Sequence, residues 1–219
     1  MQIRILSMTA QRGGEEILIT VELCEDVFDT EADDPYRLPK RENRQLSILT
    51  DRYTEIRPMK GVIDEELFGV LEDAAAFTEA VRMGSRMLAF GAQTKHALEI
   101  RLHQKGAKRE VAREAVTYLT ERGYIVEEAD AVREAERNVR KLRGRNRIRS
   151  ILYEKGYDGD AIAAADAYMD GVDFVDVCRV LIRKRYAALA ADPAQHKRMA
   201  ATLMRNGFTM REIRAAMER

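Results

Sequence analysis

The pattern of apolar positions changes once along the chain, near residue 60. Before that point the period is two: Ile17, Ile19, Val21 and Leu23 alternate with Leu18, Thr20, Glu22 and Cys24. Residues 3–6 form a second short strand candidate, with a glycine-containing turn at residues 12–15 between the two. Residues 44–49 fit a third strand. The pattern therefore predicts a small β-hairpin region over residues 1–60.

An acidic segment interrupts this region. Residues 22–34 hold seven Asp or Glu and no Lys or Arg, and Pro35 and Pro39 follow. A polar stretch broken by prolines does not support a strand or a helix. We expect residues 22–43 to form an acidic insertion, loosely packed or mobile over residues 25–43.

From Asp64 onward the pattern is helical. Asp64-Glu65-Glu66 is typical of a helix start, because acidic side chains are stabilised near the positive end of the helix dipole. No proline occurs between Pro58 and Pro193, and glycines separate the long helical segments.

Three of these glycines reveal an internal repeat. Gly106, Gly156 and Gly207 are 50 and 51 residues apart. Each fits the left-handed position just beyond a helix C-terminus, where a side chain would be strained. Apolar residues recur four and eight positions earlier, on one helix face: Leu102, Leu152 and Leu203, then Leu98, Ile148 and Met199. Three copies at near-constant spacing indicate a tandem repeat.

Each repeat has room for three helices, and none is large enough to bury a core well alone. We therefore predict a mainly α protein in which three-helix repeats stack into an elongated, curved rod behind a small β-containing region. The predicted division is 1–60 for the β-hairpin region, then repeats at 61–123, 124–172 and 173–219.

The segment from Gly123-Tyr124 to Tyr157 resembles the RecX family. That family combines Gly-Tyr, an acidic pair, an Ala-containing helix, a basic stretch and Arg-x-Ile-x-x-x-Leu-x-x-Lys-Gly. The matching residues are Glu127-Glu128, Ala131, Arg143-Gly144, Arg147-Ile148, Leu152 and Lys155-Gly156. The closing stretch Leu203–Phe208 with Ile213 is similar to the family's ending, and the likeness covers most of residues 44–219.

The resemblance implies a regulator that binds RecA nucleoprotein filaments. It would inhibit the recombinase, coprotease and ATPase activities of RecA without being an enzyme and without a cofactor. We expect a monomer, with single-stranded DNA as a further candidate partner. No stretch approaches 18 apolar residues, and the N-terminus MQIRILSMTAQRGGEE lacks the apolar region of a signal peptide. We therefore expect a cytoplasmic protein with no membrane span.

Charge is distributed unevenly, although the total is zero. Residues 1–91 hold 11 Lys/Arg and 18 Asp/Glu, and residues 92–219 hold 26 and 19. The densest run has seven cations in residues 137–149 and no acid, and six of the seven are arginines, which bind phosphate or carboxylate in a bidentate fashion. A solvated face is the alternative interpretation. The candidate filament-contacting residues are Arg137, Arg140, Lys141, Arg143, Arg145, Arg147 and Arg149.

Other chemistry is weakly represented. His96, Glu99 and His103 share one helix face, but a metal site needs more open geometry than a packed face offers. Cys24 and Cys178 are predicted to be ordinary unpaired residues. Glycine-rich phosphate loops and nucleophile elbows are absent from the sequence. Two alternatives remain open: a helical DNA-binding protein that acts independently of RecA, and a scaffold that binds only protein.

Overall fold

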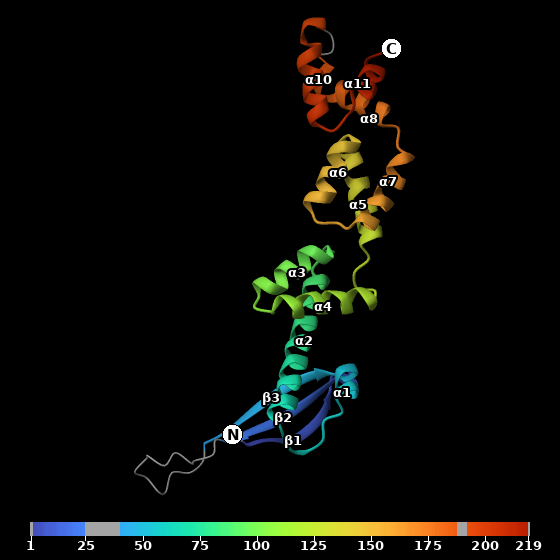
Figure 1. The fold of residues 1–219 in the computed structure, drawn as a ribbon. Helices are drawn as coiled ribbons and strands as arrows, with labels where there is room; N and C mark the ends of the chain where they lie inside the picture. The colour runs from blue at the N-terminus through green and yellow to red at the C-terminus, as the bar shows by residue number, and fades with distance from the viewer. Residues whose placement is uncertain (1, 25–39, 188–191, 219) are drawn as a thin grey trace, which may run out of the picture. The chain divides into compact units, whose positions relative to one another are not determined.

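A computed structural model describes residues 2–24, 40–187 and 192–218, apart from the side chain of Pro193, and is mainly helical with a small antiparallel sheet (Figure 1). The predicted fold class is confirmed in that respect. The strands are β1 Gln2–Gln11, β2 Glu16–Cys24, β3 Arg41–Leu49 and β4 Gly61–Ile63. The helices are α1 Thr50–Ile56, α2 Glu65–Ala89, α3 Lys95–Gln104, α4 Arg109–Glu121, α5 Glu127–Arg140, α6 Arg145–Glu154, α7 Gly159–Asp170, α8 Phe174–Leu181, α10 His196–Arg205 and α11 Met210–Met217.

Short turns complete the list. A 3₁₀ turn, η1 (Arg12–Gly14), joins β1 to β2, a π-helical turn, η2 (Ile182–Tyr186), extends α8, and a 3₁₀ turn, η3 (Pro193–Gln195), precedes α10. The chain divides into two compact bodies. The N-terminal body comprises Met1–Met87 and Glu99–Glu121, and the C-terminal body comprises Leu88–Leu98 and Arg122–Arg219. The boundaries expected for the β-hairpin region and for the three repeats stay a prediction.

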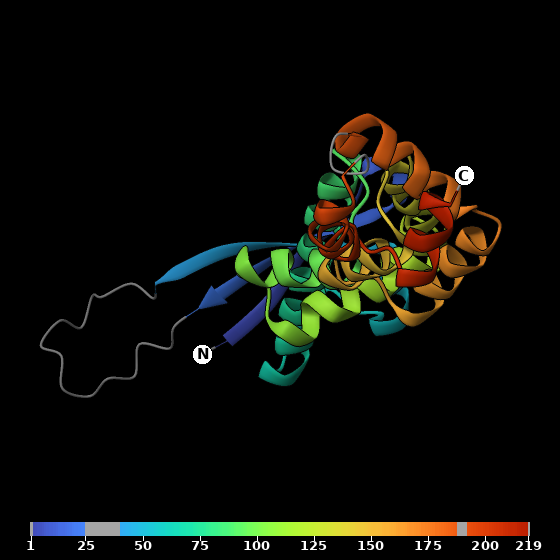
Figure 2. The same ribbon diagram turned by 90° about the horizontal axis from the view of Figure 1, so that it is seen from above.

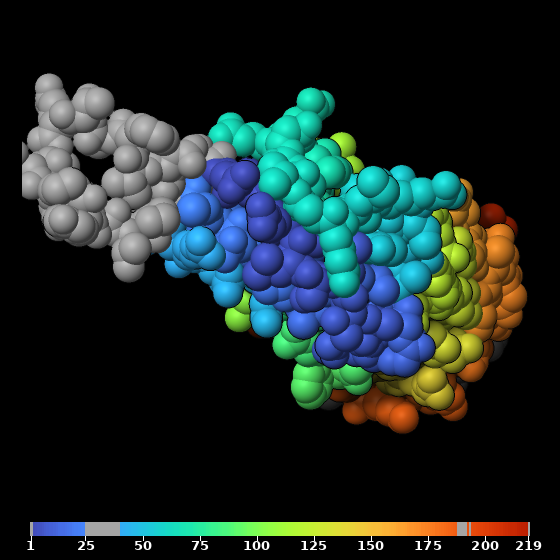
Figure 3. Space-filling view, turned by 90° about the horizontal axis from the view of Figure 1, so that it is seen from below, coloured from blue at the N-terminus to red at the C-terminus, as the bar shows by residue number. Residues whose placement is uncertain are grey.

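The sheet has the strand order β3-β2-β1-β4, and all neighbours are antiparallel. The three long strands run side by side in Figures 1 and 2. The period of two decides which face is buried: Ile19 and Val21 are fully buried, and they pack with Phe68 and Leu71 of α2. In Figure 3 the atoms of β1 and β2 (dark blue) lie at the surface on the view from below.

The acidic insertion is shorter than predicted. Glu22 pairs with Asn43 and Cys24 with Arg41, so residues 22–24 and 41–43 belong to the β2–β3 ladder. An ion pair of 3.5 Å between Arg41 and Glu22 supports this end of the ladder. The expectation of loose packing was therefore wrong at residues 41–43. Of its remainder, Lys40 is exposed and outside the strands, and residues 25–39 lie outside the described residues.

The predicted helix start at Asp64 is confirmed. Asp64 Oδ1 accepts a hydrogen bond of 2.7 Å from the backbone N–H of Leu67, and α2 begins at the next residue, Glu65. This is the arrangement of a helix N-cap, in which a carboxylate satisfies a backbone donor that the helix leaves free.

The three repeat glycines lie where the sequence places them. Helices α3, α6 and α10 end two residues before Gly106, Gly156 and Gly207, whose φ values are +103°, +76° and +94°. In each turn the glycine N–H donates to the carbonyl three residues earlier. The N–H of the next residue donates to the carbonyl of the repeat leucine, at 3.1 Å for Leu102, 3.2 Å for Leu152 and 3.2 Å for Leu203. This paired bonding is the Schellman motif.

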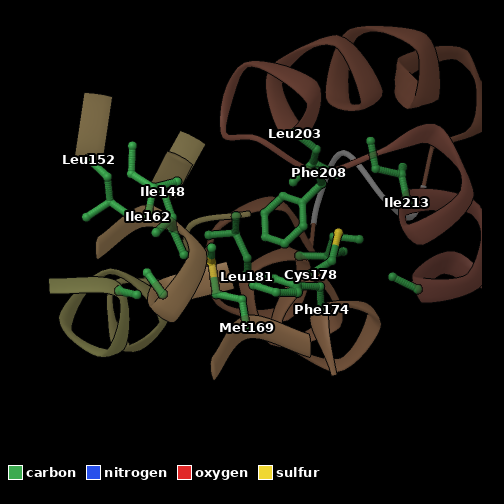
Figure 4. Close-up of a cluster of buried hydrophobic side chains, with 14 of the residues drawn as sticks. Ile148, Leu152, Ile162, Met169, Phe174, Cys178, Leu181, Leu203, Phe208 and Ile213 are labelled. Carbon is green, nitrogen blue, oxygen red and sulfur yellow. The ribbon is translucent and has the colours of Figure 1, made fainter. Parts of the chain in front are cut away.

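The C-terminal body has one continuous apolar core (Figure 4). In it α5 packs against α7, and α8 packs against α11, so the first helix meets the third in both the second and the third predicted repeat. Phe208, which follows the last repeat glycine, lies among Leu203, Leu181 and Cys178 in Figure 4. The repeat residues Ile148, Leu152, Met199 and Leu203 are all fully buried.

Candidate functional site

The basic run lies on α5, α6 and the turn between them, and close backbone contacts hold this region in place. The Gly144 N–H donates to the carbonyl of Asn206 at 2.8 Å, just before the Gly207 turn. One repeat earlier, Thr94 Oγ1 donates to the carbonyl of Lys155 at 3.0 Å, just before the Gly156 turn. The start of α3 therefore contacts the glycine turn after α6, and the start of α6 contacts the glycine turn after α10.

A buried carboxylate supports the start of α5. Glu127 is 1% exposed and accepts hydrogen bonds from the backbone N–H groups of Lys95 and, at 3.4 Å, of Asp158. Burial raises the pKa of Glu127 above its ordinary value, while the Lys95 ammonium, 2.8 Å away, lowers the pKa of Asp158. Asp158 also caps α7 through the Ala161 N–H. This polar cluster joins the beginnings of α3, α5 and α7.

Four members of the run are exposed: Arg137 and Arg140 on α5, Lys141 just after it, and Arg149 on α6. The side chains of Arg133, Arg137 and Arg140 are 66%, 59% and 73% exposed, and Lys141 at the helix end is exposed too. The three arginines are paired with carboxylates of the same helix, Arg137 with Glu134 and Arg140 with Glu136 at 3.5 Å. The Arg140–Glu136 pair is exposed on both sides, and such a pair at helical spacing contributes only a few tenths of a kcal/mol, so the Arg140 guanidinium remains free to bind another anion.

The arginines of α6 are turned toward α7 or along their own helix. Arg145 bonds to Asp170 at 2.6 Å, and its guanidinium lies 5.8 Å from the centre of the Phe174 ring. Arg149 lies 3.4 Å from Asp166 of α7. Arg147 pairs with Glu154 at 2.9 Å. The cations of the run are therefore partly neutralised, because α7 supplies acids that are distant in the sequence.

A second network surrounds Glu134. This nearly buried carboxylate accepts hydrogen bonds from Asn138 at 2.9 Å and Lys155 at 2.8 Å, as well as from Arg137. Arg143 extends the network by donating to Asn138 Oδ1 at 2.7 Å. Burial alone would raise the pKa of Glu134, but the bonds to Lys155 and Asn138 outweigh it and hold the pKa below its ordinary value. Arg143 is thus tied to the packing of α5.

Once these partners are counted, the region around the run is not basic. Residues 124–172 hold 9 Lys/Arg and 10 Asp/Glu, whereas residues 173–219 hold 10 and 5. Most of the positive excess of residues 92–219 therefore lies in the third predicted repeat. Counting acids over a whole repeat, instead of within the run, would have found it from the sequence.

The cations of the third predicted repeat also have fewer ion-pair partners than those of the second. Eight of them are exposed and have no carboxylate within ion-pair distance among residues 2–24, 40–187 and 192–218: Arg183, Lys184, Arg185, Lys197, Arg198, Arg205, Arg211 and Arg214. They lie on η2, α10 and α11. The analysis of the run alone did not single them out.

Within the described part of the chain, no group of three His, Cys, Asp or Glu side chains is placed to hold a metal. His103 Nδ1 lies 3.0 Å from the carbonyl of Ala107, and the His96 ring lies against Gly156. Cys24 and Cys178 are both free, and burial raises the pKa of the Cys178 thiol to about 11, which disfavours a reactive thiolate. No described helix combines the length and the apolar character needed to cross a membrane.

These features define a mainly helical protein whose C-terminal body carries exposed cations. The regulatory protein RecX of Chlorobaculum tepidum is 30% identical over 148 residues, which cover 67% of this chain and 91% of that protein. The chain belongs to the RecX family of regulatory proteins, which are not enzymes. Regulatory protein RecX of Xanthomonas axonopodis pv. citri is 34% identical over 128 residues, 56% of this chain and 76% of that protein.

Solved structures agree on the fold. A crystal structure of regulatory protein RecX matches with a TM-score of 0.73 at 17% identity, over 99% of this chain and 100% of the other. RecX from Lactobacillus salivarius matches with a TM-score of 0.59 at 16% identity, over 66% of this chain and 96% of the other. No protein-family model matches the chain.

Proposed function

We propose that this chain binds RecA nucleoprotein filaments as a RecX-like regulator and inhibits the recombinase, coprotease and ATPase activities of RecA. Membership of the RecX family supports the regulatory class. The observation that carries the filament target is the set of exposed cations on the C-terminal body, because a nucleoprotein filament presents a polyanion. The protein acts in the cytoplasm as a monomer and needs no cofactor.

The contact surface in this proposal includes the seven cations of the basic run. Arg137, Arg140 and Lys141 are exposed and contact the filament directly. The half-buried Arg145 and Arg147 take part through the guanidinium edges that their ion pairs leave accessible. Arg143 and Arg149 complete the set at the α5–α6 turn and on the α7 side of α6.

The third-repeat cations extend this surface. Lys197 and Arg198 stand at the start of α10, and Arg183, Lys184 and Arg185 follow one another on η2. Because they have no internal carboxylate partners among the described residues, binding phosphate does not require breaking an ion pair first. Their contribution should therefore exceed that of the paired arginines, charge for charge.

The decisive experiment measures RecA ATPase activity on single-stranded DNA with increasing amounts of this protein. We expect inhibition, since any ligand that binds one filament state preferentially shifts the assembly equilibrium toward it. Unchanged ATPase activity and unchanged filament length at saturating protein would contradict the proposal.

The second candidate function is DNA binding without RecA, and the positive excess in residues 173–219 favours it. Affinity for naked single-stranded DNA, measured over a range of salt concentrations with and without RecA, separates the two. Binding that is equally tight and equally salt-dependent without RecA supports the second candidate. Binding that needs RecA supports the first.

A further inference from the structure

The N-terminal body carries a groove that has no role in the proposed filament contact. It lies between α1, α2 and α4 and has a volume of about 440 Å³. Its apolar lining comes from Ile56 of α1, Val70, Ala74 and Phe77 of α2, and Val111 of α4. Five of its eleven lining residues are apolar and six are charged, so the groove pairs an apolar strip with charged groups.

The apolar wall is partly uncovered. Phe77 lines the groove but is buried, in an edge-to-face pair with Tyr118 at a centroid distance of 5.6 Å. Val70 lines the same groove and is 44% exposed, although its neighbours Phe68 and Leu71 are buried in the sheet core. An aliphatic side chain of a ligand would cover it and remove apolar surface from water.

The rim is acidic. Four carboxylates surround the groove, from Glu55, Asp73, Glu110 and Glu114, against two cations, Arg52 and Lys108. Both cations are already engaged. Arg52 bonds to Glu55 and Glu114 and lies 4.7 Å from the Phe77 ring centre, and Lys108 is 3.6 Å from Asp73.

Among the four rim carboxylates, Glu110 is the one without an ion-pair partner in the described part of the chain, and it is exposed on α4. With a rim charge of −2 from four carboxylates and two cations, the groove attracts a positively charged group and repels phosphate. This charge disfavours nucleic acid as its occupant, whereas the exposed cations of the C-terminal body favour a polyanion.

We propose that this groove binds a partner-protein segment in which an aliphatic side chain stands next to Lys or Arg. The aliphatic side chain would lie against Val70 and the half-buried Ile56 and Val111, and the cation would bond to Glu110 and to the free oxygens of Glu55 or Glu114. This site is separate from the filament-binding cations and goes beyond the proposed function, because its ligand is a protein segment of the opposite charge.

The test uses the full chain and the synthetic peptide acetyl-Gly-Lys-Leu-Leu-Lys-Gly-amide, with binding followed by NMR chemical-shift changes of the backbone amides up to millimolar peptide. We expect shifts confined to α1, α2 and α4, with weak, roughly millimolar affinity for so short a ligand. Two peptide controls, with Glu in place of both Lys and with Ser in place of both Leu, should give no such shifts.

Two protein variants complete the test. Glu110→Lys should weaken the peptide about tenfold or more, since it inverts the unpaired rim charge, and Glu128→Lys, an exposed change on α5, should leave the affinity unaltered. Absence of shifts with the Lys-Leu peptide, or equal shifts with the Glu peptide, overturns the proposal. Because RecA and DNA are absent, this outcome is independent of whether filament binding occurs.

Discussion

A methyl group placed on Gly207 would lie 2.7 Å from the carbonyl oxygen of Gly144. The two glycines let the α10 turn approach the start of α6 closely enough for two backbone hydrogen bonds. One joins the Gly144 N–H to Asn206 O at 2.8 Å, and the other joins the Asn146 N–H to Gly207 O at 3.2 Å. This contact fixes the beginning of the helix that carries Arg145, Arg147 and Arg149.

The first prediction follows from this contact. Gly144→Ala should destabilise the protein by about 1–3 kcal/mol, because the new methyl would meet the backbone of Gly207 and Phe208, which cannot move aside like a flexible side chain. The φ of Gly144 is −77°, so the effect would come from the close approach and not from backbone strain. Urea unfolding measures it. Gly159→Ala is the matched control, since nothing lies within 4 Å of its added methyl.

The second prediction concerns the repeat leucines. Leu152 is fully buried, and Leu152→Ala should lower the free energy of unfolding by about 2–5 kcal/mol through lost burial and a residual cavity. Tyr153→Ala, at the adjacent position whose residue is 60% exposed, should cost less than about 1 kcal/mol. Equal effects of the two substitutions in chemical denaturation would show that the leucine does not carry the repeat core.

The third prediction is a pH dependence at Glu134. Its folded-state pKa lies below the ordinary 4.5, so the folded state favours the ionised carboxylate. That stabilisation is complete at pH values above the unfolded pKa and is lost as the pH falls through the folded pKa. Glu134→Gln should therefore be less stable than the parent at neutral pH, and the difference should shrink below about pH 4. Unfolding curves of both proteins across acidic pH test this, and a difference that does not change with pH would contradict it.

The sequence predicts the elements with a strong local signal. Alternation locates β2, and the Leu-x-x-x-Gly pattern locates the ends of α3, α6 and α10, because a helix C-terminus with a left-handed glycine is specified by a few adjacent residues. It does not predict β4 or α1. The three residues of β4, Gly61–Ile63, have no periodic signal and depend on pairing with Ile3, Arg4 and Ile5 of β1.

The site is less predictable for a related reason. The run at 137–149 looks uncompensated in the sequence, since its partners Asp166 and Asp170 lie on α7 and reach Arg149 and Arg145 only through packing. Local density of charge therefore overestimated the net charge of the region. The groove of the N-terminal body was not anticipated either, because its residues come from three separate helices.

The last prediction separates the two groups of cations. The double substitution Arg140→Glu with Lys141→Glu tests the exposed end of α5, and Lys197→Glu with Arg198→Glu tests the start of α10. Arg145 is a poor choice for charge reversal, because it bonds to Asp170 and lies over Phe174, so its loss would also disturb packing. Arg109→Glu with Arg113→Glu on α4 provides a control with the same change in net charge, at two exposed positions.

If each cation makes one charge-assisted bond to the filament, each double reversal should weaken binding by about 3–6 kcal/mol, from about 1.5–3 kcal/mol a bond. We expect the larger loss for Lys197 and Arg198, which have no internal carboxylate partner among the described residues, whereas Arg140 already pairs with Glu136 at 3.5 Å. Circular dichroism checks that each variant is folded, and inhibition of RecA ATPase measures binding. A folded α5 variant that inhibits like the parent, beside an α10 variant that does not inhibit, would place the contact on the third repeat and leave the α5 arginines as a solvated face.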